Sequence, residues 1–120
     1  MAEPARELDP DALKKLAEII GHDGAIEIVQ TFRADIQNRL TEFKTGLQQG
    51  DLKLVERAAH TLKSGSAYVG GHSFAGLCQT LETAASESRT EILLEKQHEF
   101  EQRLLRISAE LLALESGANS

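Results

Sequence analysis

Hydrophobic residues recur along the chain at spacings of three and four positions, which is the period of an amphipathic helix. The repeats stop at glycines and at short polar turns, which are typical helix ends. The pattern predicts five helices with approximate bounds of 10–20, 23–49, 51–69, 73–86 and 90–115. In the last helix, the inward stripe comprises Leu93, Gln97, Phe100, Leu104, Ile107, Leu111 and Leu114.

The connections between the last four predicted helices contain only a few residues each. Short connections force neighbouring helices to run antiparallel. We therefore expect an all-α fold, an antiparallel up-down-up-down four-helix bundle with a short extra N-terminal helix packed across one end. A length of 120 residues leaves room for one domain, residues 1–120. We expect a monomer, because all the strong stripes can be buried within it.

Composition and charge limit the partners of the chain. The formal net charge is −6, with 19 acidic and 13 basic residues, so nucleic acid is a poor partner. No uninterrupted apolar stretch approaches the roughly 20 residues that a membrane span requires, so we expect no membrane partner. The N-terminus lacks the pattern of a signal peptide, and the single Cys78 cannot form an internal disulfide. These features favour the reducing cytoplasm.

The third predicted helix carries one histidine among small residues, in the run AAHTLKSGSAYVGG at positions 58–71. At about 100° per residue, His60 lies about 160° from the apolar stripe of its helix, so it is expected to face water. Arg57 lies one turn before it, and Lys63 and Ser64 lie one turn after it. The outward face of this helix is therefore locally basic in an acidic protein.

This arrangement suits phosphoryl chemistry. A neutral imidazole offers a ring nitrogen for attack on phosphorus, Lys63 could offset the charge of the transferring group, and the Ser64 hydroxyl could donate to its oxygens. Exposed histidines and charged strips are nevertheless common on protein surfaces. The small residues that follow have two open readings, room for a partner surface or close packing between helices. They are Gly65, Ser66 and Ala67.

A longer motif includes these residues. It reads His60-Thr61-Leu62-Lys63-Ser64-Gly65-Ser66-Ala67, followed by Gly70, Leu77, Cys78, Leu81 and Glu82. The motif resembles the signature of histidine-containing phosphotransfer (HPt) domains. The resemblance implies that His60 accepts a phosphoryl group from the aspartate of a response-regulator receiver domain and passes it to another receiver, or back, in a two-component phosphorelay. It assigns phosphoryl stabilisation to Lys63, places Ser64 where many members have glycine, and gives Glu82 a structural position.

The resemblance also implies that the chain is a phosphoryl carrier rather than an enzyme, with no ATP-binding kinase domain and no cofactor or metal of its own. Mg²⁺ would belong to the receiver, and the partners would be receivers of a hybrid histidine kinase and of a downstream regulator. The ring nitrogen farther from the backbone would react. Docking is expected beside His60, although burial of the isoleucines under the N-terminal helix is equally consistent. The candidate docking residues are Ile19, Ile26, Ile28 and Arg57.

Other functions are compatible with parts of the pattern. An adaptor of HPt shape could bind a receiver or kinase without carrying phosphate. The chain could also be the phosphorylated domain of a chemotaxis-type kinase, although Met1 and the short polar C-terminus favour a free-standing protein. Glu95 and His98 form a Glu-x-x-His pair, but a di-iron bundle site needs two such pairs facing inward. Cys78 lies on an apolar face and is expected to be a buried hydrophobe.

Overall fold

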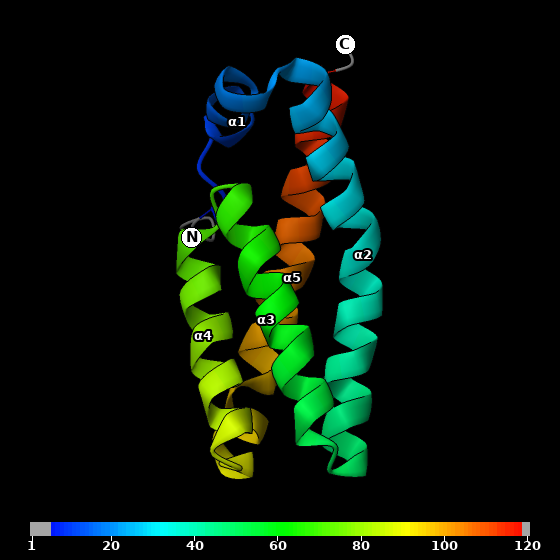
Figure 1. Ribbon diagram of the computed structural model, residues 1–120, viewed down its shortest axis with the longest axis vertical. Helices are drawn as coiled ribbons and strands as arrows, with labels where there is room; N and C mark the ends of the chain where they lie inside the picture. Colours follow the sequence, from blue (N-terminus) through cyan, green and yellow to red (C-terminus); the bar gives the residue numbers. More distant parts are fainter. Residues whose placement is uncertain (1–5, 119–120) are drawn as a thin grey trace, which may run out of the picture.

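The computed structural model describes residues 6–118 and contains five helices and no strand in that range (Figure 1). The helices are α1 (Ala12–Ile20), α2 (His22–Gln49), α3 (Leu52–Tyr68), α4 (His72–Ser86) and α5 (Thr90–Ala118). The all-α class expected from the hydrophobic pattern is confirmed. Residues 1–5 and 119–120 of the expected domain, including Met1, lie outside the described residues. The largest change from the expected bounds is at α5, which continues from position 115 to Ala118.

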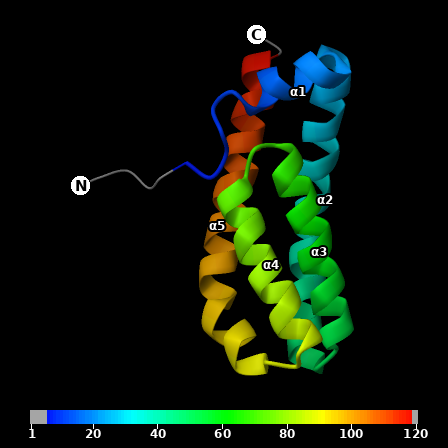
Figure 2. The ribbon, with the colours of Figure 1, turned by 60° about the vertical axis from the view of Figure 1, so that its left-hand side comes forward.

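Four of the helices lie along the long axis of the molecule, and the shorter α1 lies at the end where α5 finishes (Figures 1 and 2). The chain direction alternates from α2 to α5, as the colours of Figure 1 show. The helix α3 packs against α2 and α4, and α5 packs against the same two helices. These contacts close a ring of four helices, and α1 packs against α2.

A tight turn joins α2 to α3 and sets the phase of α3. Gly50 adopts a left-handed conformation with a φ of 70°, and its backbone N–H donates to the carbonyl of Gly46. The carboxylate of Asp51 then accepts from the backbone N–H of Leu54 at 3.2 Å, which caps α3. A Cβ at Gly46 would lie 2.7 Å from Cγ2 of Val55, so only glycine permits this close approach of the two helices.

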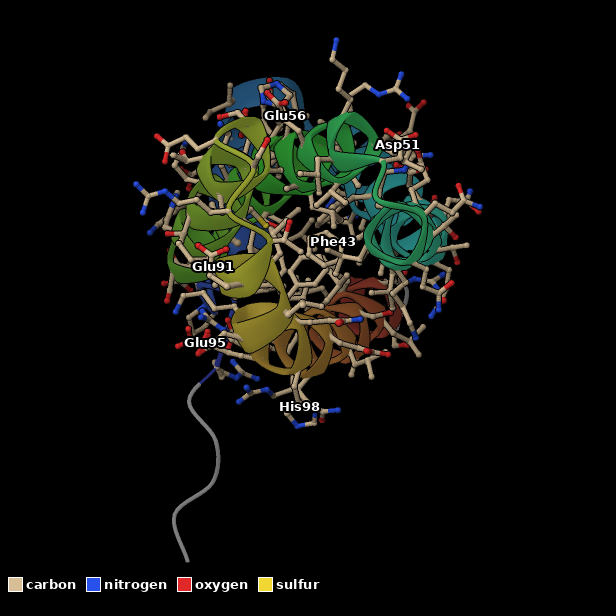
Figure 3. All side chains as sticks on the ribbon, turned by 90° about the horizontal axis from the view of Figure 1, so that it is seen from below. Phe43, Asp51, Glu56, Glu91, Glu95 and His98 are labelled. Atoms are coloured by element: carbon tan, nitrogen blue, oxygen red, sulfur yellow. The ribbon has the colours of Figure 1, made fainter. Side chains whose placement is uncertain are left out.

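The core is formed by the inward stripes of the helices. Phe43 stacks on Phe100 with ring centroids 4.3 Å apart, and Phe74 also stacks on Phe100, with ring centroids 5.7 Å apart. Seen along the bundle, Phe43 points into the space between the helices, whereas Glu95 and His98 lie at the periphery (Figure 3). The three buried rings join α2, α4 and α5 and hold the two helices on either side of α3 in place.

The segment before α1 is anchored, which the sequence pattern did not indicate. Leu8 is buried in the core, and the backbone N–H of Asp9 donates to the carbonyl of Gly70 at 3.2 Å. The Glu7 carboxylate, whose side chain is only 7% exposed, accepts from Nη2 of Arg103 at 2.8 Å and from its Nε at 3.0 Å. The backbone N–H of Leu8 donates to Glu110. These bonds attach the segment to α5 and to the α3–α4 turn.

Candidate functional site

His60 lies on the outward face of α3, as the helical phase predicted. Its side chain is 60% exposed, whereas Ala59 and Leu62 on either side of it are fully buried. The buried residues fix the rotation of α3, so the imidazole is held at the surface by the packing of the opposite face. A partner molecule can therefore reach the ring without any movement of the backbone.

One ring nitrogen of His60 is bonded across to the next helix. Nδ1 lies 3.0 Å from Oε2 of Glu82 on α4. An ionised carboxylate only accepts hydrogen bonds, so the hydrogen must be on Nδ1. In the neutral ring this leaves the lone pair on Nε2, which has no hydrogen-bond partner within residues 6–118. The arrangement presents a nucleophilic nitrogen to solvent.

Lys63 shares the same carboxylate. Its Nζ donates to Oε1 of Glu82 at 2.7 Å and to Oε1 of Gln79 at 2.8 Å. The amide of Gln79 is held in turn, because its Nε2 donates to the hydroxyl of Thr83 at 3.0 Å. The ammonium group therefore lies next to the imidazole, but it is engaged with α4 rather than extended into solvent.

Glu82 is ionised at neutral pH. Partial burial alone would raise the pKa of its carboxyl, but the hydrogen bonds from Lys63 and His60 outweigh that effect and hold the pKa below its usual value. Glu82 has a side chain only 18% exposed, so the pair with Lys63 is partly shielded from water. The resemblance implied only a structural position for Glu82, and these two contacts were not predicted.

The small residues after His60 divide into two groups. A Cβ on Gly65 would lie 2.5 Å from the ring of Phe32, so Gly65 allows α2 and α3 to approach closely. Ser66 is fully buried. Of the two readings left open by the sequence, the structure favours close packing for both, because both face neighbouring helices. Ala67 and Ser64 are exposed on the histidine face.

An apolar groove of about 640 Å³ begins beside His60 and runs between α2 and α3. Thr61, the neighbour of His60, lines one end of it. The apolar lining consists of Ile20, Ile28, Phe32, Gly65 and Tyr68. Two acidic residues, Glu27 and Asp35, also line it.

The candidate docking residues only partly coincide with this groove. Ile28 lines the groove, whereas the half-buried Ile26 and the 80% exposed Ile19 do not. The apolar periodicity did not single out Tyr68, which is 64% exposed. Its position two turns after Thr61, on the same helical face as Thr61, was a usable signal.

A second, polar cavity of about 380 Å³ lies on the other side of His60. Arg57 lines this polar cavity and does not line the apolar groove. The expectation that Arg57 and the isoleucines form one docking surface is therefore not met by the lining of the groove. The full lining is Arg39, Glu42, Glu56, Arg57, His60, Thr61 and Glu82. Figure 3 shows Glu56 at the periphery of the bundle. His60 and Thr61 thus stand between an apolar and a charged depression.

Residues 27–117 match the family model described as the Hpt domain. The chain belongs to the Hpt domain family. It is also similar to the crystal structure of histidine-containing phosphotransfer protein B (HptB) from Pseudomonas aeruginosa PAO1, with 28% sequence identity and a TM-score of 0.77. That match covers 94% of this chain and 97% of the HptB chain. A comparison with curated proteins gave no match.

The Hpt match covers α3, α4 and nearly all of α2 and α5, so it includes His60 and its hydrogen-bond partner Glu82. The short α1 and the anchored segment before it lie outside the matched range. In the described part of the chain, no helix is long and apolar enough to cross a membrane. Cys78 is buried, and burial raises the pKa of its thiol to about 12. The thiol is therefore protonated at neutral pH, which fits a hydrophobic packing role for it within this Hpt domain.

Proposed function

We propose that this chain is a phosphoryl carrier in which His60 accepts a phosphoryl group from the phospho-aspartate of a receiver domain and passes it to another receiver, or back. The observation that carries the proposal is the bond between Nδ1 of His60 and Glu82 at 3.0 Å, which leaves Nε2 exposed. The scaffold is an antiparallel four-helix bundle with α1 across one end. The similarity to HptB, a histidine-containing phosphotransfer protein, supports the same function.

The transfer is an in-line displacement at phosphorus. The lone pair on Nε2 of His60 forms the new N–P bond while the bond between phosphorus and the aspartate oxygen breaks, and that oxygen keeps the electron pair. The ring gains positive charge but keeps its hydrogen on Nδ1. The carboxylate of Glu82 accepts a hydrogen bond from Nδ1 and stabilises the charged ring, so it acts in both the attack and the reverse reaction.

Lys63 and Ser64 are the proposed phosphoryl-stabilising groups of α3. The ammonium of Lys63 is already positioned by Glu82 and Gln79, so it lowers the local negative potential without having to be ordered during transfer. The exposed Ser64 is one turn from His60, and its hydroxyl can donate to a phosphoryl oxygen. Mg²⁺ is proposed to come with the receiver, and this chain is proposed to need no cofactor of its own.

The apolar groove is the proposed docking surface for the receiver. It adjoins His60 through Thr61, so a domain that fills it would place an active site over the imidazole. Ile28 and Tyr68 supply apolar area, and the exposed Ile19 of α1 is proposed to add to it. The proposed partners are receivers of a hybrid histidine kinase and of a downstream regulator, met by a monomer in the cytoplasm. The acidic Glu27 and Asp35 favour receivers with basic residues around their docking patch.

The test is transfer from a phosphorylated receiver in the presence of Mg²⁺, followed by intact-mass measurement of this chain. We expect the wild type to gain one acid-labile phosphoryl group and His60→Gln to gain none while keeping its helical circular dichroism. Phosphorylation of His60→Gln would assign the acceptor to another residue. Tight binding of several phosphorylated receivers without any transfer would instead support the adaptor function.

A further inference from the structure

The polar cavity beside His60 contains a cation that the mechanism above does not use. Arg39 comes from α2, and it lines the same space of about 380 Å³ as His60, Thr61 and Glu82. Lys63, which lies one turn after His60 on α3, is engaged with Glu82 and Gln79. Arg39 therefore faces the histidine from a different helix, with a separate set of partners.

The partners of Arg39 hold its guanidinium in place without using all of its hydrogen-bond donors. Its Nε lies 3.3 Å from Oδ2 of Asp35, and its Nη1 lies 2.7 Å from Oε1 of Glu42. Both carboxylates are on α2, so they tether the guanidinium to its own helix. Yet Nε of Arg39 and Oε1 of Glu42 are buried and make no hydrogen bond of acceptable geometry. A guanidinium has five N–H donors, and most of these remain available.

The charged groups that line the cavity indicate what these donors could bind. Three carboxylates line it, those of Glu42, Glu56 and Glu82, against the guanidinium groups of Arg39 and Arg57. A phosphoryl group on Nε2 would add a charge of roughly −1.5 to −2 to this space. Without a cation turned toward it, that group would meet net repulsion. A planar guanidinium fork matches two phosphoryl oxygens better than an ammonium does.

We propose that Arg39 binds the phosphoryl group once it is on His60, with its guanidinium donating to two phosphoryl oxygens while Asp35 retains it on α2. This inference rests on the proposed function, because it concerns the product of the same transfer. Arg39 stabilises phospho-His60 relative to the phospho-aspartate of the receiver. Glu42 competes with the phosphoryl oxygens for the same donors.

The experiment measures how the phosphoryl group is shared at equilibrium between this chain and a receiver with Mg²⁺, together with the hydrolysis rate of the isolated phosphoprotein. We expect Arg39→Gln to lower the ratio of phospho-His60 to phospho-aspartate by about tenfold, the effect of losing a charge-assisted hydrogen bond. Arg39→Lys should give an intermediate ratio. The control Arg89→Gln removes the same charge at an exposed position that pairs with Glu87, and should leave the ratio unchanged.

The variant Glu42→Gln separates phosphoryl binding from a structural role of Arg39. If Arg39 only supports the fold through Glu42, the two variants should act alike. If Arg39 binds the phosphoryl group, Glu42→Gln should raise the ratio while Arg39→Gln lowers it. Normal phosphorylation of His60 with an unchanged ratio in Arg39→Gln would overturn this inference and leave the proposed function intact. Failure of the wild type to accept any phosphoryl group would refute the proposed function itself.

Discussion

Oε2 of Glu82 lies 3.0 Å from Nδ1 of His60, so a carboxylate on α4 determines which nitrogen of a histidine on α3 carries the hydrogen. The other oxygen of the same carboxylate holds Lys63 at 2.7 Å. One side chain therefore sets both the tautomer of the nucleophile and the position of the Lys63 ammonium. The geometry of the site depends on the packing of two helices rather than on the motif of one.

Replacement of Glu82 by glutamine should slow phosphoryl transfer. The amide cannot supply the negative charge that stabilises the ring after attack, and it can donate to Nδ1 and so favour the wrong tautomer. We expect the single-turnover transfer rate to fall about tenfold, since about 1.4 kcal/mol is lost from the transition state. Nitrogen NMR of His60 should show hydrogen on Nδ1 in the neutral wild type. Glu87→Gln, an exposed change at the end of α4, is the matched control and should transfer normally.

The stability of the protein should depend on pH through Glu82. Its pKa is lowered in the folded state, so the unfolded state binds more protons between the folded pKa and the usual value of 4.5. The stabilisation is thus fully present above that usual value and is lost as the pH falls through the folded pKa. The free energies of unfolding of the wild type and Glu82→Gln, measured with urea, should differ by a constant amount around neutral pH. The two values should converge in acid. A difference that grows in acid would contradict the lowered pKa.

The hydrophobic pattern predicts the helices more fully than it predicts the contacts between them. The exposure of His60 followed from helical phase alone, because the buried stripe of α3 is regular. The hydrogen bonds that Glu82 accepts from His60 and Lys63 depend on the register of α3 against α4. Residue spacing along either helix does not determine that register. Leu8 and Glu7 were missed for another reason, since a short irregular segment has no periodicity that could indicate burial.

Loss of Arg103 should release the segment before α1. Its guanidinium binds both oxygens of Glu7 and the hydroxyl of Ser73, and it lies 5.7 Å from the ring centre of Phe74. Arg103→Gln leaves the negative charge of the shielded Glu7 carboxylate without its main positive partner. We therefore expect a loss of about 1–3 kcal/mol in the free energy of unfolding. Hydrogen exchange should accelerate at the amide of Leu8. The control is Arg106→Gln, since Arg106 is more exposed and lies 3.9 Å from Glu7.

Two glycines in helices should respond in opposite directions to alanine. At Gly65 a Cβ would lie 2.5 Å from two atoms of the Phe32 ring, so Gly65→Ala forces the ring or the helix to move, at a cost of about 1–3 kcal/mol in stability. At Gly76 a Cβ would meet nothing within 4 Å, so Gly76→Ala should stabilise α4 by about 0.5–1 kcal/mol.

The displaced Phe32 ring should also alter the apolar groove, because Phe32 and Gly65 both line it. Gly65→Ala is therefore expected to weaken binding of an unphosphorylated receiver, measured by calorimetry, whereas Gly76→Ala should bind it as the wild type does. Equal losses of affinity in both variants would trace the effect to helix dynamics in general. Unchanged affinity in Gly65→Ala, with the expected loss of stability, would place receiver docking away from the groove.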